Sequence, residues 1–166
     1  MKIEKQDSAE RQRLAELIEP SRVAMLTTVD AQGQLTSKPM SPIELDAQGC
    51  VWFFTDRKSN TPAQLERLNL SFCNVDRGDY VSVVGGGVLL DDRERMKALW
   101  TPMARPWFPE GPESPELRLL KIVPHSAEYW DSPNSKMVRL FAIAASVAAA
   151  RPVGLGEHGN LDVARH

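Results

Sequence analysis

An apolar, aromatic strand runs directly into a polar and cationic turn at Cys50-Val51-Trp52-Phe53-Phe54-Thr55-Asp56-Arg57-Lys58-Ser59-Asn60, and Pro62 then falls in the first turn of a short helix. Hydroxyls, backbone N–H groups and two cations meet where this helix begins, and such a place can bind an anion such as phosphate. The aromatic strand offers a flat apolar wall beside it, so the combination predicts a phosphorylated aromatic ligand. The same pattern is also an ordinary connection between a strand and a helix, and the stretch alone leaves both interpretations open.

The strand at 50–55 follows a repeated turn. The tetrapeptide Asp-Ala-Gln-Gly occurs at 30–33 and again at 46–49, between β-rich segments at 23–29, 34–45 and 50–55. Turns of this kind between such segments predict three antiparallel strands. Three more strands are expected at 70–75, 80–90 and 117–130, and the three glycines at 85–87 suggest a bulge in the fifth strand.

Six short strands separated by helices predict a small antiparallel barrel, in the mainly β with α (α+β) class. A single domain is expected over 1–150, with an N-terminal helix at about 7–19, the barrel at about 22–131 and a C-terminal helix at about 135–150. Residues 151–166 are rich in glycine and are expected to form a flexible tail.

Composition excludes several functional classes. The chain has 166 residues, a net charge of −2 and a pI near 5.9, which gives no electrostatic footprint for nucleic acid. Its charged start resembles no signal peptide, and its apolar runs are too short to span a membrane, so we expect a cytoplasmic protein. Cys50 and Cys73 have no CxxC spacing and no nearby histidine, so we expect buried free thiols and no metal site.

Six segments in order carry a resemblance to a known family: Met25-Leu26-Thr27-Thr28-Val29, Ser37-Lys38-Pro39-Met40, Trp52-Phe53-Phe54-Thr55, Tyr80-Val81-Ser82-Val83, Trp107-Phe108-Pro109-Glu110-Gly111-Pro112 and Glu128-Tyr129-Trp130-Asp131. Together they resemble the bacterial general stress proteins of the pyridoxamine 5′-phosphate oxidase-like superfamily, which has the FMN-binding split barrel. The resemblance covers about residues 11–150. No single segment is diagnostic, and the six in register carry it jointly.

The resemblance implies a six-stranded split β-barrel and a homodimer that holds FMN, rather than FAD, in clefts at the subunit interface. The strand at 25–28 would line the flavin ring, and Lys38 would lie near the phosphate or the ribityl chain. Trp107 and Trp130 would approach the ring, with the partner subunit as a source. The full set of cofactor-binding residues expected from the resemblance is Met25, Leu26, Thr27, Thr28, Lys38, Pro39, Met40, Phe54, Thr55, Lys58, Ser59, Thr61, Trp107 and Trp130.

The chain departs from the family pattern in two places. Ser59-Asn60-Thr61 stands where the family usually has Ser-x-Lys at the phosphate, so a hydroxyl replaces a cation. Because a charge-assisted hydrogen bond is about twice as strong as a neutral one, FMN would bind less tightly unless Lys38, Arg57 or Lys58 compensates. The true oxidases end in a basic segment that holds the substrate phosphate, and this chain has Asp131-Ser132-Pro133-Asn134 instead. That difference argues against oxidation of pyridoxamine 5′-phosphate.

Three functional interpretations stay open. The chain could be a flavin-dependent oxidoreductase of unknown substrate, whose chemistry the flavin supplies, so that no acid–base pair need be visible. It could also be a flavin-binding or ligand-buffering module that catalyses nothing. The third interpretation is a structural dimer whose flavin site has decayed, as Thr61 suggests. The catalytic residues stay unknown.

Overall fold

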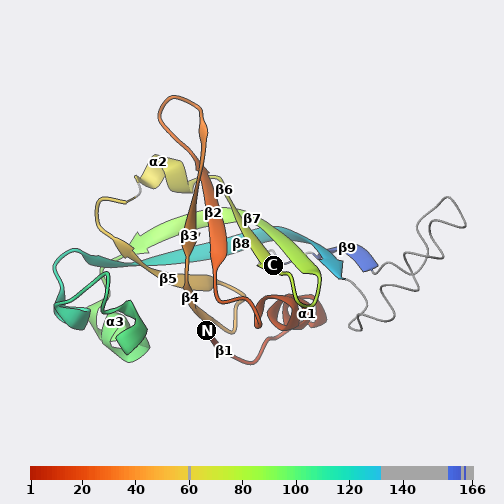
Figure 1. Ribbon diagram of the computed structural model, residues 1–166, viewed down its shortest axis with the longest axis horizontal. Coiled ribbons are helices and arrows are strands. Elements are labelled where there is room, and N and C mark those ends of the chain that lie inside the picture. The colour runs from red at the N-terminus through yellow and green to blue at the C-terminus, as the bar shows by residue number, and fades with distance from the viewer. Residues whose placement is uncertain (60, 132–156, 162, 164–166) are drawn as a thin grey trace, which may run out of the picture.

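The computed structural model describes residues 1–59, 61–131, 157–161 and 163. Nine strands form one sheet, and short helices lie around it (Figure 1). The elements in chain order are β1 (Lys2–Ile3), α1 (Ala9–Ile18), β2 (Ala24–Val29), β3 (Leu35–Met40), β4 (Pro42–Leu45), β5 (Val51–Asp56), α2 (Pro62–Leu65), β6 (Leu68–Asn74), β7 (Asp79–Leu90), α3 (Arg93–Leu99), 3₁₀ turns at Pro102–Ala104 and Gly111–Glu113, β8 (Leu117–Asp131) and β9 (Glu157–Leu161).

The sheet curls into a half-barrel. Eight strands lie in the order β1-β4-β5-β8-β7-β6-β2-β3, and β9 pairs separately with β8. The consecutive strands β3 and β4 therefore lie near opposite ends of this order, and the single residue Ser41 joins them. The chain itself thus links the two ends of the curled sheet, from which the hairpin β2–β3 projects (Figure 1).

The mainly β class with few helices is confirmed, but the count of six strands is wrong. The expected strand at 34–45 divides at Ser41 into β3 and β4, since Pro39 and Pro42 cannot donate ladder hydrogen bonds. The sequence prediction also missed β1 and β9. A purely antiparallel sheet is wrong as well, because β1 runs parallel to β4. The expected strands at 70–75, 80–90 and 117–130 correspond to β6, β7 and β8.

Two apolar clusters hold the fold together. The larger one lies between α1 and the inner face of the sheet, with Leu14, Leu26, Phe53, Leu70 and Ile122 among its fully buried members. The smaller one lies where α3 and the following loop cover β5 and β8, and it contains Trp52, Met96, Phe108, Leu117 and Leu119. β5 therefore faces a core on both sides.

The helix ends follow their capping residues. The Ser8 hydroxyl accepts from Arg11 N at the start of α1, which lies inside the expected range of 7–19. The Asp92 carboxylate accepts from Arg95 N at 2.9 Å and starts α3. Within the part of the chain described, no helix is both long enough and apolar enough to cross a membrane.

Two further expectations need correction. Cys50 is buried, but Cys73 is exposed, because its side chain lies on the outer face of β6. The prediction of a flexible tail is wrong at 157–161, which form β9 along residues 127–131 of β8. Leu161 and the neighbouring Val163 are buried in the larger cluster, and this burial anchors the strand. The helix expected at 135–150 falls outside the described residues.

Candidate functional site

The end of β5 meets β3 at a polar corner, which we define by Lys38, Lys58, Ser59 and Thr61. The Lys38 ammonium reaches across from β3 and donates to the carbonyl oxygen of Ser59 at 3.3 Å. Burial lowers the pKa of Lys38 below its ordinary value, although the carboxylate of Asp56 acts in the opposite direction. A second cation, Lys58, extends into solvent from the same turn and lies 3.8 Å from Glu116.

The backbone N–H groups of this turn are used within the protein. Arg57 N donates to Glu116 O, Lys58 N to the Asp56 carboxylate and Ser59 N to Asp56 O, at 2.8, 2.7 and 3.0 Å. The sequence stretch suggested that such N–H groups would hold an anion. In the folded turn, an anion at the polar corner would instead meet mainly the side chains of Lys38, Lys58 and Ser59.

Thr61 is a helix cap. Its backbone N–H and its hydroxyl both donate to Gln64 Oε1, at 2.9 and 3.1 Å, and Pro62 occupies the first helical position of α2. The spacing Thr-x-x-Gln is the sequence signature of a capping box, so the sequence carried a signal for this structural role. The hydroxyl that stands at the expected phosphate position is thus already engaged.

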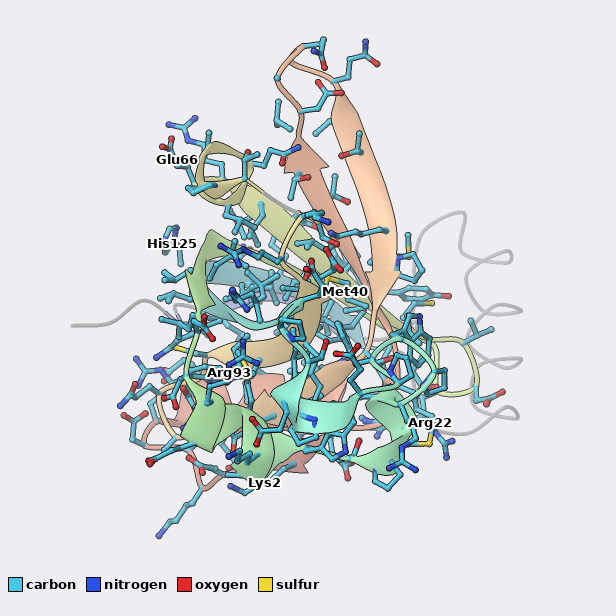
Figure 2. The ribbon with its side chains drawn as sticks, turned by 90° about the vertical axis from the view of Figure 1, so that its left-hand side faces the viewer. Lys2, Arg22, Met40, Glu66, Arg93 and His125 are labelled. Atoms are coloured by element: carbon cyan, nitrogen blue, oxygen red, sulfur yellow. The ribbon has the colours of Figure 1, made fainter. Side chains whose placement is uncertain are left out.

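The β2–β3 hairpin divides its candidate residues between two faces. Directly paired residues share a face of the sheet. Leu26 pairs with Lys38, and Thr28 pairs with Thr36. Leu26 and Thr28 are buried, so this is the inner face. Met40 belongs to the same face and packs against the larger cluster. Figure 2 shows it near the centre of the molecule.

Met25, Thr27 and Pro39 lie on the opposite, outer face. Met25 is 40 % exposed and pairs with Pro39, while the Thr27 hydroxyl lies 2.7 Å from that of Ser37. The direct pairs of Met25 continue from strand to strand across the sheet and form one row of residues. Its members on this outer face are Pro39, Met25, Ser71, Ser82, Glu128 and Asn160.

Trp130 shares this outer face, one row further along β8. It is 42 % exposed and pairs with Tyr80 of β7, which is 45 % exposed. Trp107 is 72 % exposed on the loop that precedes β8. Phe108, next to Trp107, packs with Leu117 at the start of β8. Trp130 lies near the end of this 15-residue strand, and a strand of that length spans about 45 Å. One copy of the chain therefore cannot bring both indoles to a single flavin ring.

Phe54 and Thr55 point in opposite directions from β5. Phe54 packs in the smaller cluster against Trp100, with ring centroids 5.6 Å apart. Thr55 is buried, with its side chain on the other side of the strand. The structure therefore brings Lys38 into contact with the turn that carries Lys58 and Ser59 and precedes Thr61, while the other expected residues are distributed over the inner face, the outer face and the loop.

A shallow cavity of about 530 Å³ opens beside the hairpin, between β2, β3, the end of α2 and β7. Its mainly apolar wall includes Thr27, Leu35 and Val84, and Glu66 and His125 lie on the same side of the molecule (Figure 2). The cavity can take a flat apolar group, and two of the expected ring-contacting residues, Thr27 and Thr28, line it.

His125 lines this cavity because of a β-bulge that the sequence partly predicted. Val84 pairs with Ser126 and Gly85 with Pro124, so His125 is an extra residue in β8. A Cβ at Gly85 would lie 2.3 Å from Val123 O, which explains why glycine stands there. The three glycines indicated a bulge in β7, whereas the extra residue lies opposite them in β8, and they did not indicate which side chain would turn outward.

Residues that could bind a metal do not gather in the described ranges: no group of three or more histidine, cysteine, aspartate or glutamate side chains is placed to hold one ion. The polar corner has the composition of an anion site instead. Two ammonium groups and a hydroxyl are what a phosphate monoester binds in proteins.

Comparison with known proteins agrees with the geometry. The family model described as pyridoxamine 5′-phosphate oxidase like matches residues 9–152. The solved structure of a candidate general stress protein 26 from Jannaschia sp. CCS1 is 26 % identical, with a TM-score of 0.72 over 91 % of this chain and 96 % of that one. The general stress FMN/FAD binding protein of Xanthomonas citri is also 26 % identical, with a TM-score of 0.63 over 75 % and 90 %. Protein bli-3 of Neurospora crassa is 26 % identical over an alignment of 152 positions that covers 84 % of this chain and 73 % of that protein.

Proposed function

Because the chain belongs to the pyridoxamine 5′-phosphate oxidase-like family, we propose that it is an FMN-binding general stress protein that acts as a flavin-dependent oxidoreductase on a substrate still to be identified. Structural relatives that share 26 % of its sequence include a protein described as an FMN/FAD binding protein of the general stress type. FMN is favoured over FAD because the polar corner is suited to a terminal phosphate monoester.

The polar corner is the observation that carries this proposal. Lys38 is held half-buried, and burial makes its charged form costly, as its lowered pKa indicates. A phosphate dianion beside Lys38 would favour the charged form and raise that pKa again. Lys58 and Ser59 would add a second cation and a hydroxyl, so the donor set fits a phosphate without the lysine that the family resemblance implies at position 61.

Bound FMN would supply hydride or electron transfer, chemistry that the side chains lack. The residues of this chain would bind and orient the cofactor. Lys38 and Ser59 of one subunit would hold the phosphate end, while the outer face of a second copy, with Met25 and Trp130, would cover an aromatic ring and keep water from it. Burial of an apolar ring and charge-assisted bonds to the phosphate together give the orientation.

We further propose that the active form is a cytoplasmic homodimer. Trp107 and Trp130 lie at opposite ends of β8, so a flavin that meets both indoles needs two copies of the chain. The outer face also exposes apolar side chains, among them Met25, Tyr80 and Val84. A second subunit laid on this face would bury them and would close a cofactor site that is open in the single chain.

A flavin-binding module without turnover is the second candidate. The hydroxyl of Thr61 is directed at Gln64, so the position where the family resemblance implies a phosphate-binding lysine contributes a helix cap here. Weak retention of FMN would suit a protein that stores or carries the cofactor. If the purified flavoprotein is reduced by NADPH or NADH under anaerobic conditions, the oxidoreductase is favoured, and a failure of every such donor favours the module.

Titration with FMN tests the proposed function. The purified protein should be yellow or should bind added FMN, and Lys38→Ala should weaken binding about 10- to 100-fold, because a hydrogen bond to a charged group contributes about 1.5–3 kcal/mol. Lys38→Arg should retain most of the affinity, and Lys5→Ala, at an exposed position on the N-terminal segment, serves as the charge-matched control. A colourless protein that binds no added FMN would contradict the proposal.

Substitutions at position 61 test whether the missing lysine lowers the affinity for FMN. Thr61→Lys should tighten FMN binding about threefold to tenfold if residue 61 faces the phosphate, because a cation replaces a hydroxyl. Thr61→Val, which removes the hydroxyl without adding charge, is the control for loss of the cap. Equal affinities in wild type and Thr61→Lys would mean that this position does not meet the phosphate.

A further inference from the structure

Three exposed aromatic side chains form one row across the last strands of the outer face. Tyr80 of β7 pairs directly with Trp130 of β8, and Trp130 pairs directly with His158 of β9. Directly paired residues on neighbouring antiparallel strands point to the same face, with Cβ atoms about 5 Å apart. Since Tyr80 and Trp130 are 45 % and 42 % exposed, this row is a surface that a planar molecule can reach.

The imidazole of His158 covers one side of Trp130. The two ring centroids are 5.0 Å apart and the ring planes differ by 12°, so the rings are stacked. This distance lies within the range of about 4.5–7 Å that aromatic pairs adopt. Because the imidazole occupies one face of the indole, a second planar ring would have to reach the opposite face, on the side of β7, where Tyr80 lies.

The position of His158 is fixed from the other side of the sheet. A Cβ at Gly159 would lie 2.8 Å from the Tyr129 hydroxyl, so glycine leaves room for the phenol ring of its direct partner on β8. Leu161 and Val163 are 8 % and 2 % exposed and belong to the larger apolar cluster. These contacts set the register of β9 and leave its neighbouring residue, His158, directly over the indole.

We propose that His158 is a positioning residue that holds Trp130 with the indole face opposite the imidazole turned toward a planar aromatic ligand, and that this ligand is the isoalloxazine ring of FMN. The inference rests on the proposed function for the identity of the ring. It adds that β9, a strand added at the end of the chain, orients the indole. A stacked partner removes the rotational freedom of Trp130 before the ligand arrives, so less entropy is lost on binding.

The flavin-free protein tests the stack itself. The near-ultraviolet circular dichroism of Trp130, taken as the difference between wild type and Trp130→Phe, should fall to about half or less in His158→Ala, because the stacked partner that fixes the ring is removed. His158→Phe should retain the band. Asn160→Ala changes the same face of the same strand, two residues away, and should leave the band unchanged. A full-strength band in His158→Ala would overturn the proposal.

Cofactor affinity tests the consequence. FMN binding should weaken about threefold to tenfold in His158→Ala and in Gly159→Ala, which displaces β9 while keeping the imidazole. His158→Phe and Asn160→Ala should bind FMN as wild type does. The positioning role is overturned if Trp130→Ala weakens binding and His158→Ala does not. If the band changes as expected but wild type binds no FMN, the stack stands, whereas the flavin role and the proposed function both fail.

Discussion

The same four residues, Asp-Ala-Gln-Gly, make two turns of this protein and have different surroundings in each. At 30–33 they form the tip of the projecting β2–β3 hairpin, and at 46–49 they connect β4 to β5. Each aspartate carboxylate accepts from two backbone N–H groups, at 2.9 and 2.8 Å in the first turn and at 3.0 and 2.9 Å in the second. Each glycine has a positive φ, 79° and 76°. Locally the turns are the same.

Their surroundings differ at every contact. The second oxygen of Asp46 accepts from Trp52 Nε1 at 2.8 Å and lies 3.7 Å from Lys121, and Asp46 is only 7 % exposed. The Gln6 amide also donates to its carbonyl oxygen. Gly33 is exposed, and nothing lies within 4 Å of a Cβ built there. Sequence therefore determines the shape of the turn, whereas tertiary packing determines how much the turn contributes to stability.

Amide hydrogen exchange should show the largest difference between the turns. Gly33 N and Gly49 N make equivalent bonds to Asp30 O and Asp46 O, at 3.0 and 2.9 Å, and follow identical residues, so their intrinsic exchange rates should match. Gly49 is buried, and its turn should open only with a large part of the domain. We expect it to exchange about 100-fold more slowly or slower than Gly33, which opens with the hairpin tip. Similar rates would mean that both turns open locally.

Removal of each aspartate should give the next largest difference. Asp46→Ala leaves three N–H donors without their acceptor in a buried place, and it should lower the free energy of unfolding by about 3–4 kcal/mol. Asp30→Ala leaves the N–H groups of Gln32 and Gln34 to water. It should lower the free energy of unfolding by about 1 kcal/mol. Urea denaturation of both variants measures this. Equal losses would show that the contacts around Asp46 add nothing to the turn.

The features that the sequence predicted correctly depend on neighbours in the chain. The two turns and the strands that flank them need only a few consecutive residues, and these agree with the structure. The family was also recognisable, because six segments kept their order. The capping box at Thr61 also follows from neighbouring residues, since Gln64 stands three residues later. The family resemblance nevertheless placed that threonine at the phosphate of FMN.

The features that were missed depend on residues far apart. β9 forms because Leu161 and Val163 find room in a core that residues of β2, β6 and α1 build, and no local pattern contains that fact. The distribution of Met25, Leu26 and Lys38 over two faces follows from strand register. Alternation along β2 could have indicated the faces, but the pairing of Lys38 with the turn after β5 required the curl of the whole sheet.

A double-mutant cycle should isolate what the indole adds to the second turn. Trp52→Phe keeps a ring for the guanidinium of Arg95, which lies 3.9 Å from the centroid, and removes the Nε1 donor. Combined with Asp46→Ala, its effect on unfolding should be non-additive by about 1–2 kcal/mol, because both changes remove one hydrogen bond. Combined with Asp30→Ala, the effects should add within about 0.5 kcal/mol. Additivity in both cycles would assign the extra stability to burial alone.

Alanine at the two glycines should give the smallest contrast. Both positions have positive φ, so Gly33→Ala and Gly49→Ala should each lower the free energy of unfolding by about 1 kcal/mol. A Cβ at Gly49 would also lie 3.2 Å from Cδ of Arg11, a flexible side chain that can move aside. The difference in unfolding free energy between the two variants should therefore stay near 0.5 kcal/mol or below, by the usual scale of surface adjustments. A much larger loss at Gly49 would mean that Arg11 cannot yield, and that α1 is held rigidly against the turn that leads into β5.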